Sequence, residues 1–298
     1  MSTIPAKGHS KQQSQELRGI ALITGTFMAF AVLDAAAKYA AMTVAPLFLV
    51  WLRFLVQAAL ILVLTRPSQW KAIVTFKRPA MQILRSLFLV GATIFNFFAL
   101  RELQLTQTVS ILFCSPFVVT ILGVVLLKEK VGLHRWGAII AGFCGVLIIF
   151  RPGITDLPIE VIYSFITMLC YSAYTLTTRM LAPTETATSM VYFPALFVSI
   201  IMIPFALPYA AMPANDAIIA ILIAGIIGAL GHWFHTAAHK YAPASTLAPY
   251  MYIEIIWMII LGYILFSDVP DMYTLTGALV ICASGLYLLH RERQKQSL

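Results

Sequence analysis

Charged side chains lie inside several long apolar stretches of this sequence, where an unpaired charge is costly and normally faces a cavity or a partner. Asp34 lies seven residues before the end of one stretch, and Arg53 seven residues after the start of the next. A tight hairpin would place both about 10 Å below the same surface, at about 1.5 Å per residue. They are predicted to pair, either as a structural ion pair or as groups that gate a pathway or hold a substrate carboxylate. Lys38, one turn from Asp34, would complete a charged cluster.

Glu254 is the deepest acidic residue, nine residues into the stretch 245–266 and so about 13 Å from its start. A carboxyl group at that depth suits a proton-coupling group or a contact for a substrate ammonium. A protonated Glu254 that only hydrogen-bonds a neighbouring helix is an equally simple alternative. Pro249, and Pro116 in the stretch 107–127, each remove a backbone hydrogen bond at depth, which either frees carbonyl groups toward a cavity or merely kinks the helix.

Two more stretches carry a polar, aromatic face. Tyr171 and Tyr174 lie too deep to be interfacial tyrosines, so they predict a cavity wall that stacks an aromatic or cationic ligand. In a later stretch, glycines at helical spacing allow a close helix approach that turns His232 and His235 toward the same cavity. His235 and His239 have the spacing of metal ligands, but no nearby acid or Cys completes a site, and no metal is predicted.

Asn96 and Ser115 add uncharged polar groups, each of which is either a helix-packing hydrogen bond or a ligand contact. Glu254 is the candidate for a proton-coupling group. The full candidate substrate cavity comprises Asp34, Lys38, Arg53, Asn96, Ser115, Tyr171, Tyr174, His232, Trp233, His235, Tyr250 and Glu254.

The elements that must position these side chains are membrane helices. Of the 298 residues, 60% are hydrophobic and only 11% charged, far from the roughly 25% charged content of soluble domains. Continuous apolar stretches of about 20 residues fit transmembrane helices, and the lack of period-2 alternation excludes a strand barrel. The ten predicted spans are 20–41, 46–65, 81–100, 107–127, 133–150, 159–178, 188–209, 217–238, 245–266 and 273–290.

Positive charge orients these spans. With the N-terminus in the cytoplasm, 15 of the 20 Lys and Arg residues fall on inner segments and only two on outer loops. This bias predicts a protein of the bacterial inner membrane with both termini in the cytoplasm. The net charge of +8 is then explained by orientation among membrane lipids, and no nucleic-acid partner is expected.

The two halves of the chain resemble each other. Residues 99–129 align with 238–268 at an offset of 139, which matches several apolar residues and pairs Glu129 with Asp268. Five spans per copy would put the second copy upside down relative to the first. The predicted organisation is a cytoplasmic tail (1–16), a first five-helix repeat (17–150), an inverted second repeat (151–290) and a second cytoplasmic tail (291–298).

A likeness to a known family rests on polar and glycine positions, chiefly in the first copy. They are Arg53, the stretch Ala99-Leu-Arg-Glu-Leu-Gln-Leu-Thr-Gln-Thr108, Ser115-Pro116, Gly123 through Leu127-Lys-Glu129, and Gly137, Gly142 and Gly145. The chain resembles the EamA type of the drug/metabolite transporter superfamily over nearly its whole length, although the second copy has Asp268 for the usual Glu. The resemblance implies a ten-helix basket around a central cavity. Within this family the chain is most similar to bacterial exporters of neutral and aromatic amino acids.

These expectations favour a secondary active transporter that exports neutral or aromatic amino acids by alternating access. An importer of a cofactor-like metabolite, such as S-adenosylmethionine, riboflavin or a nucleotide derivative, is the alternative. An intramembrane enzyme that uses Glu254 and His232 is a third hypothesis, but the sequence lacks the GxxxxGKS/T, HExxH and GxSxG motifs of nucleotide-driven and hydrolytic proteins. We expect a monomer with a small-molecule substrate and no cofactor.

Overall fold

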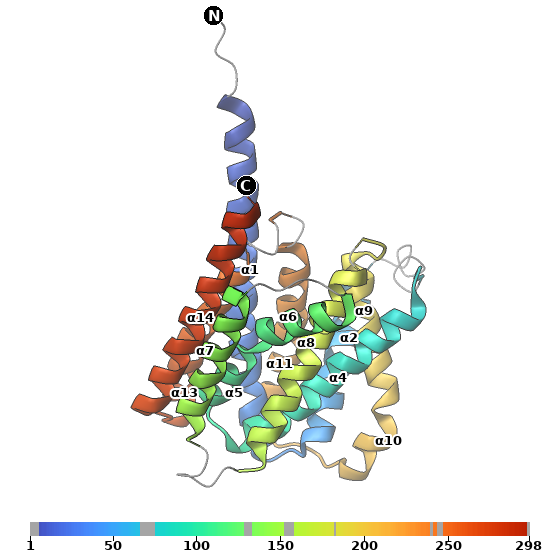
Figure 1. Ribbon diagram of the computed structural model, residues 1–298. Helices are drawn as coiled ribbons and strands as arrows, with labels where there is room; N and C mark the ends of the chain where they lie inside the picture. Colours follow the sequence, from blue (N-terminus) through green and yellow to red (C-terminus); the bar gives the residue numbers. More distant parts are fainter. Residues whose placement is uncertain are drawn as a thin grey trace, which may run out of the picture.

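The computed structural model describes residues 6–65, 75–127, 133–151, 158–181, 183–238, 241–242 and 247–296. Every regular element within these ranges is a helix (Figure 1), which confirms the all-α class. In chain order they are α1 (Ala6–Ala41), α2 (Pro46–Leu64), α4 (Pro79–Glu102), α5 (Leu105–Leu112), α6 (Ser115–Leu127), α7 (Leu133–Phe150), α8 (Glu160–Leu181), α9 (Ala187–Ile201), α10 (Ile203–Ala206), the 3-10 helix η2 (Leu207–Tyr209), α11 (Asn215–Ala238), the 3-10 helix η3 (Ala248–Ile253), α13 (Glu254–Phe266) and α14 (Met272–Gln296).

Several helices in the described ranges are suited to a membrane. Four are long and apolar enough to cross one: α1 from Gln15 onward, α2, α4 and α11. The segments Thr188–Ile201 and Ile203–Tyr209 are bent by 52° and make a fifth span if they count as one. Shorter apolar helices cover Leu105–Val119, Trp136–Phe150, Tyr250–Phe266 and Met272–Tyr287. The structure therefore supports a multi-pass membrane protein, while ten spans and an inverted repeat stay predictions.

Two predicted spans are irregular where prolines occur. The stretch 107–127 is interrupted by a turn between α5 and α6, because Pro116 near the start of α6 has no N–H to continue the hydrogen-bond ladder of α5. Figure 1 shows α6 running across the bundle rather than along it. Within 245–266, Pro249 belongs to η3, and the regular helix α13 begins only at Glu254. The first stretch is thus interrupted, while in the second the 3-10 helix η3 continues directly into α13, and Glu254 lies where the helix type changes.

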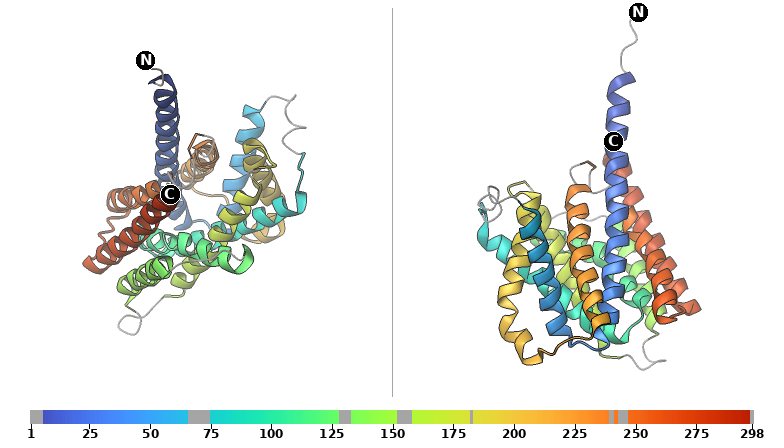
Figure 2. Two further views of the ribbon diagram at one scale, coloured as in Figure 1. Left: turned by 45° about the horizontal axis from the view of Figure 1, so that its top comes forward. Right: turned by 180° about the vertical axis from the view of Figure 1, so that it is seen from behind.

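The helices pack in pairs around the site. The most extensive packing joins α1 with α11, α4 with α8, and α7 with α14. Figure 2 shows α1 reaching beyond the bundle at the end where α14 also finishes. We call this end the terminal face and the opposite end the loop face. Because α1 starts at the terminal face, its last turns lie near the loop face.

Glycines set the closest helix approaches, as the sequence predicted for α11. A Cβ atom on Gly225 would lie 2.5 Å from a side chain of α2, and one on Gly228 would lie 2.8 Å from a side chain of α1. On α7, a Cβ atom on Gly145 would lie 2.8 Å from the carbonyl oxygen of Gly277 on α14. Only residues without a side chain allow backbones to approach this closely.

Candidate functional site

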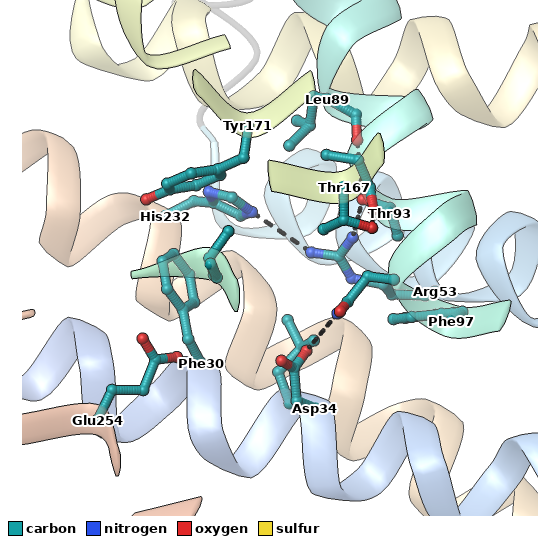
Figure 3. A pocket seen from close by; sticks show the side chains of 14 residues that line it. Phe30, Asp34, Arg53, Leu89, Thr93, Phe97, Thr167, Tyr171, His232 and Glu254 are labelled. Atoms are coloured by element: carbon teal, nitrogen blue, oxygen red, sulfur yellow. Dashed lines mark hydrogen bonds between the residues drawn. The ribbon is translucent and has the colours of Figure 1, made fainter. Parts of the chain in front are cut away.

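A cavity of about 90 Å³ opens among α1, α2, α4, α8, α11, the end of α5 and the start of α13 (Figure 3). Six of the twelve predicted residues line it: Asp34, Arg53, Asn96, Tyr171, His232 and Glu254. The rest of the lining is Phe30, Leu33, Leu89, Ala92, Thr93, Phe97, Leu112 and Thr167. The chain thus gathers two carboxyl groups, one guanidinium and several aromatic rings from five helices and one helix start.

Arg53 is the buried cation of the cavity, with 2% of its surface exposed. Its Nη1 donates a hydrogen bond to Thr93 Oγ1 at 3.3 Å, and its Nη2 lies 3.3 Å from His232 Nε2 (Figure 3). Because a guanidinium can only donate, His232 accepts at Nε2 and carries its ring proton on Nδ1. Arg53 Nε has no hydrogen-bond partner within the described residues and lies beside Gly228. The site therefore holds a neutral histidine and a guanidinium whose Nε–H makes no hydrogen bond within the described residues.

Asp34 faces the same cavity but does not pair with Arg53 as predicted. Among the described residues, no ion pair within 4.0 Å joins the two side chains. Asp34 Oδ1 instead accepts a hydrogen bond from Asn96 Nδ2 at 3.1 Å. The reason is that α4 presents Thr93 and Asn96, almost one turn apart, as neutral partners for Arg53 and Asp34 respectively. Both charges therefore stay available to a ligand.

Lys38 also departs from the prediction of a cluster with Asp34. Its Nζ donates to the carbonyl oxygen of Leu103 at 2.6 Å and lies 3.7 Å from Asp268 Oδ2. The ammonium also lies 5.2 Å from the centre of the Phe266 ring. Its long side chain thus extends toward the loop face, away from the cavity.

Glu254 enters the cavity from the first residue of α13 and is only 3% exposed. Figure 3 shows its carboxyl group and that of Asp34 reaching toward the cavity from different helices. In the part of the chain that the structure describes, no group donates a hydrogen bond to Glu254. The alternative of a glutamate that merely bonds a neighbouring helix therefore has no support in these residues.

Tyr174 and Trp233 lie outside the lining, contrary to prediction. The buried Tyr174 hydroxyl accepts a hydrogen bond from Arg85 Nη2 at 2.8 Å, just behind the cavity wall. Trp233 is 50% exposed on the outside of α11, because it follows His232 directly and so is rotated by about 100° around the helix.

Ser115, His235 and Tyr250 do not line the cavity either. Ser115 is buried, and its backbone oxygen accepts a hydrogen bond from Ser172 Oγ at 3.4 Å. Tyr250 packs on a small apolar cluster that includes Ile23. His235 is half-buried on the same side of α11 as His232, three residues earlier. Two further positions used in the predictions, His239 and Glu129, lie outside the described residues.

Sequence reasoning missed the aromatic lining and one buried arginine. Phe30 and Phe97 line the cavity, but nothing in their spacing separates them from ordinary core aromatics. Arg85 is the fifth residue of the predicted span 81–100, is 2% exposed and lies one helical turn from the lining residue Leu89. That depth was the available signal.

Comparison with known proteins decides the family. The model described as the EamA-like transporter family matches residues 17–151 and 158–290. The chain belongs to this family. The family is one of membrane transporters, and a small-molecule substrate is consistent with the named relatives of this chain.

Individual relatives of this EamA-family chain are more distant. It is 26% identical over 220 residues to an S-adenosylmethionine uptake transporter of Rickettsia felis, and the aligned residues cover 74% of this chain and 75% of that protein. It is 28% identical over 190 residues to a riboflavin transporter of Vibrio cholerae, and the aligned residues cover 63% of this chain and 64% of that protein. A crystal structure of a protein matches with a TM-score of 0.63 at 13% identity and covers 91% of this chain and 98% of the other. That likeness shows a shared fold alone.

Proposed function

We propose that this EamA-family chain is a secondary active transporter for an amino-acid-like metabolite with one extra positive charge, and that S-adenosylmethionine is the leading candidate. The observation that carries the proposal is the charge set of the cavity. Asp34 and Glu254 supply two carboxyl groups, and Arg53 supplies one guanidinium beside a neutral His232. With both carboxyl groups ionised, the lining has one net negative charge.

S-Adenosylmethionine complements this charge set. Its carboxylate suits the guanidinium of Arg53, which lines the cavity, and its ammonium and sulfonium groups suit the two carboxylates of the lining. A buried charge is strongly unfavourable unless it is paired, so a ligand with net charge +1 satisfies all of the groups together. Riboflavin, which has neither an ammonium nor a carboxylate, would leave them unpaired.

The aromatic lining supports the same assignment. Phe30 and Tyr171 line the cavity, and Figure 3 shows Phe30 beside Glu254 and Tyr171 beside His232. Ring faces attract cations such as sulfonium and stack on flat heterocycles such as adenine. The Phe30 ring centre also lies 5.1 Å from that of His232, at an angle of 59° between the planes. One side of the cavity can therefore bind a flat or cationic group while Arg53 binds an anionic one.

Export of neutral or aromatic amino acids is the second candidate, and the size of the cavity favours it. About 90 Å³ is well below the roughly 300–1,000 Å³ of pockets that enclose drug-sized ligands. A single amino acid needs less rearrangement of the helices than a nucleoside derivative does. A neutral amino acid would, however, leave one carboxylate of the cavity without a cationic partner.

The remaining parts of the proposal concern coupling and orientation. Glu254 is the proposed proton carrier, because its carboxyl group faces the cavity without a hydrogen-bond partner in the described residues. The chain would act as a monomer in the bacterial inner membrane, with both termini cytoplasmic, and would move its substrate by alternating access about the cavity.

The test is exchange of labelled S-adenosylmethionine, phenylalanine, threonine and riboflavin by the purified protein in proteoliposomes. We expect S-adenosylmethionine to exchange. Asp34→Asn should raise the half-saturation concentration for S-adenosylmethionine by about tenfold or more, because an ion pair of a buried charge is worth at least about 1.4 kcal/mol. Asp216→Asn, on the exposed first turn of α11, is the matched control and should leave exchange unchanged. Exchange of phenylalanine without S-adenosylmethionine would favour the second candidate, and exchange of riboflavin alone would refute both.

S-Adenosylhomocysteine separates the charge argument from the substrate assignment, because it lacks only the sulfonium methyl group and its charge. We expect it to compete several-fold more weakly than S-adenosylmethionine. Equal competition by the two compounds would refute the charge argument and leave the transported substrate as measured.

A further inference from the structure

Two buried cations lie on opposite sides of the cavity, and neither lines it. Lys38 lies one turn beyond Asp34 on α1, toward the loop face, and Arg85 lies one turn before Leu89 on α4, toward the terminal face. Both are buried, with 7% and 2% of their surface exposed. Each one ties together chain segments that a substrate would have to separate in order to leave on that side.

The terminal-side closure consists of Arg85, Tyr174, Thr178 and the carbonyl of Met190. Arg85 donates to Thr178 Oγ1 at 2.6 Å through Nε, to Met190 O at 2.8 Å through Nη1 and to the Tyr174 hydroxyl at 2.8 Å through Nη2. The Thr178 hydroxyl itself donates to the carbonyl oxygen of Tyr174 at 2.7 Å. One guanidinium thus joins α4, α8 and the start of α9.

This closure is in direct contact with the substrate cavity. The Tyr174 ring, which lies 4.5 Å from the Arg85 guanidinium carbon, has its centre 6.4 Å from that of His232 and 6.1 Å from that of Tyr171. Both of those residues line the cavity. Release of Arg85 would therefore free the ring that covers the cavity toward the terminal face.

The loop-side closure consists of Lys38, the carbonyl of Leu103, Asp268 and Phe266. Lys38 connects the end of α1 to the turn after α4 and to the turn after α13. Ser267 ends α13 in the left-handed region at φ 57°, and Asp268 N donates to Gly262 O at 3.0 Å. This helix cap holds the Asp268 carboxylate against Lys38.

The partners of both cations are weak for buried charges. In the described part of the chain, Arg85 bonds only neutral oxygen atoms, and the carboxylate of Asp268 is 3.7 Å from Lys38, beyond the distance of a hydrogen bond. A buried charge without a close counter-charge keeps much of its desolvation penalty. Opening to water would remove that penalty and so offset part of the free energy lost when these contacts break.

We propose that Arg85 and Lys38 are the positioning residues of two alternating closures, Arg85 for passage between the cavity and the terminal face and Lys38 for passage between the cavity and the loop face. In the structure the contacts of both closures are formed. The inference rests on the proposed alternating access, but on no particular substrate.

A cysteine-accessibility experiment tests the closures. The reporter is Thr167→Cys in the cavity wall, in a chain whose four native cysteines are replaced by alanine. Vesicles of opposite orientation are treated with a charged, membrane-impermeant thiol reagent. We expect Lys38→Met to raise the labelling rate from the loop face by about tenfold or more, and Arg85→Met to do so from the terminal face, because the lost hydrogen bonds involve a charged group.

Matched controls and second variants keep the result decisive. Arg101→Met and Arg78→Met remove exposed cations at the two faces and should leave labelling unchanged. Where a methionine variant does not accumulate as folded protein, Asp268→Asn and Tyr174→Phe weaken the same closures and should give the same opposite-sided increases. Increases from the same side, or no increase with folded variants, would overturn the proposal. Labelling needs no substrate, so failure of the substrate assignment is measured separately by exchange.

Discussion

Gly228→Ala should separate ligand binding from protein stability. Gly228 lies on α11 directly against the Arg53 guanidinium: an added Cβ would lie 3.1 Å from Nη2 and 3.4 Å from Nε, and 2.8 Å from Leu33 Cδ1. Carbon atoms do not pack this closely, so Arg53 or Leu33 must shift. The contact between Arg53 Nη2 and His232 is already 3.3 Å, near the 3.5 Å limit of a hydrogen bond, and a shift of a few tenths of an ångström breaks it.

The expected magnitudes follow from these contacts. Overpacking costs about 1–3 kcal/mol, but replacing a helical glycine by alanine returns up to about 1 kcal/mol, so the net loss of stability should be about 0–2 kcal/mol. The displaced guanidinium loses its alignment with a ligand carboxylate, and a loss of about 1.4 kcal/mol or more corresponds to at least a tenfold weaker affinity. Gly228→Ala should therefore impair binding more than stability.

Thermal unfolding in detergent and half-saturation in proteoliposomes measure the two effects side by side. Gly25→Ala is the matched control, because its Cβ would lie 3.5 Å from Phe234, an ordinary contact, so both values should stay at the wild-type level or the stability should rise slightly. Unchanged half-saturation in a destabilised Gly228→Ala variant would show that this glycine serves packing alone. That result would refute the argument that α11 positions Arg53 for a ligand.

Three further predictions concern helix packing, a helix cap and coupling. Gly145→Ala should lower the free energy of unfolding by about 1–3 kcal/mol, because its Cβ meets the backbone of α14. Gly137→Ala is the control, since no atom lies within 4 Å of its Cβ, and it should leave stability unchanged. Equal melting temperatures of the two variants would contradict this prediction. Hydrogen bonds from Thr274, in the first turn of α14, lower the pKa of Asp271. The stabilising effect of the Asp271 carboxylate therefore exists above the unfolded pKa of about 3.9 and is lost as pH falls through the folded pKa. Asp271→Asn should lower the free energy of unfolding by about 1 kcal/mol or less at pH 7 and leave it unchanged at pH 2, and a pH-independent difference would exclude this helix cap. Glu254→Gln should abolish proton-driven accumulation and, like Asp34→Asn, raise the half-saturation concentration for exchange, because the variant loses one carboxylate of the lining. Accumulation that follows wild type at every pH would remove Glu254 as proton carrier.

The sequence alone was sufficient for the properties that depend on burial cost. Continuous apolar stretches have no stable place in water, so the helical membrane class could be read directly. A charge in such a stretch must be used or paired, and this rule found Asp34, Arg53 and Glu254, which all line the cavity. Glycines at helical spacing likewise predicted the close approach of α11 to its neighbours.

The tertiary structure decided which of these groups face each other. Arg53 contacts His232, 179 residues away, and Lys38 contacts Asp268, far along the chain, because helix rotation and depth are set by packing among helices and not by local periodicity. The turn before α6 and the 3-10 helix before α13 came from the same source: a proline permits several local distortions of a helix, and the surrounding helices select among them. The sequence therefore determined that charges lie at depth, while only the packed bundle determined that Arg53 meets a histidine, that Asp34 meets an asparagine, and that Lys38 and Arg85 lie on either side of the site.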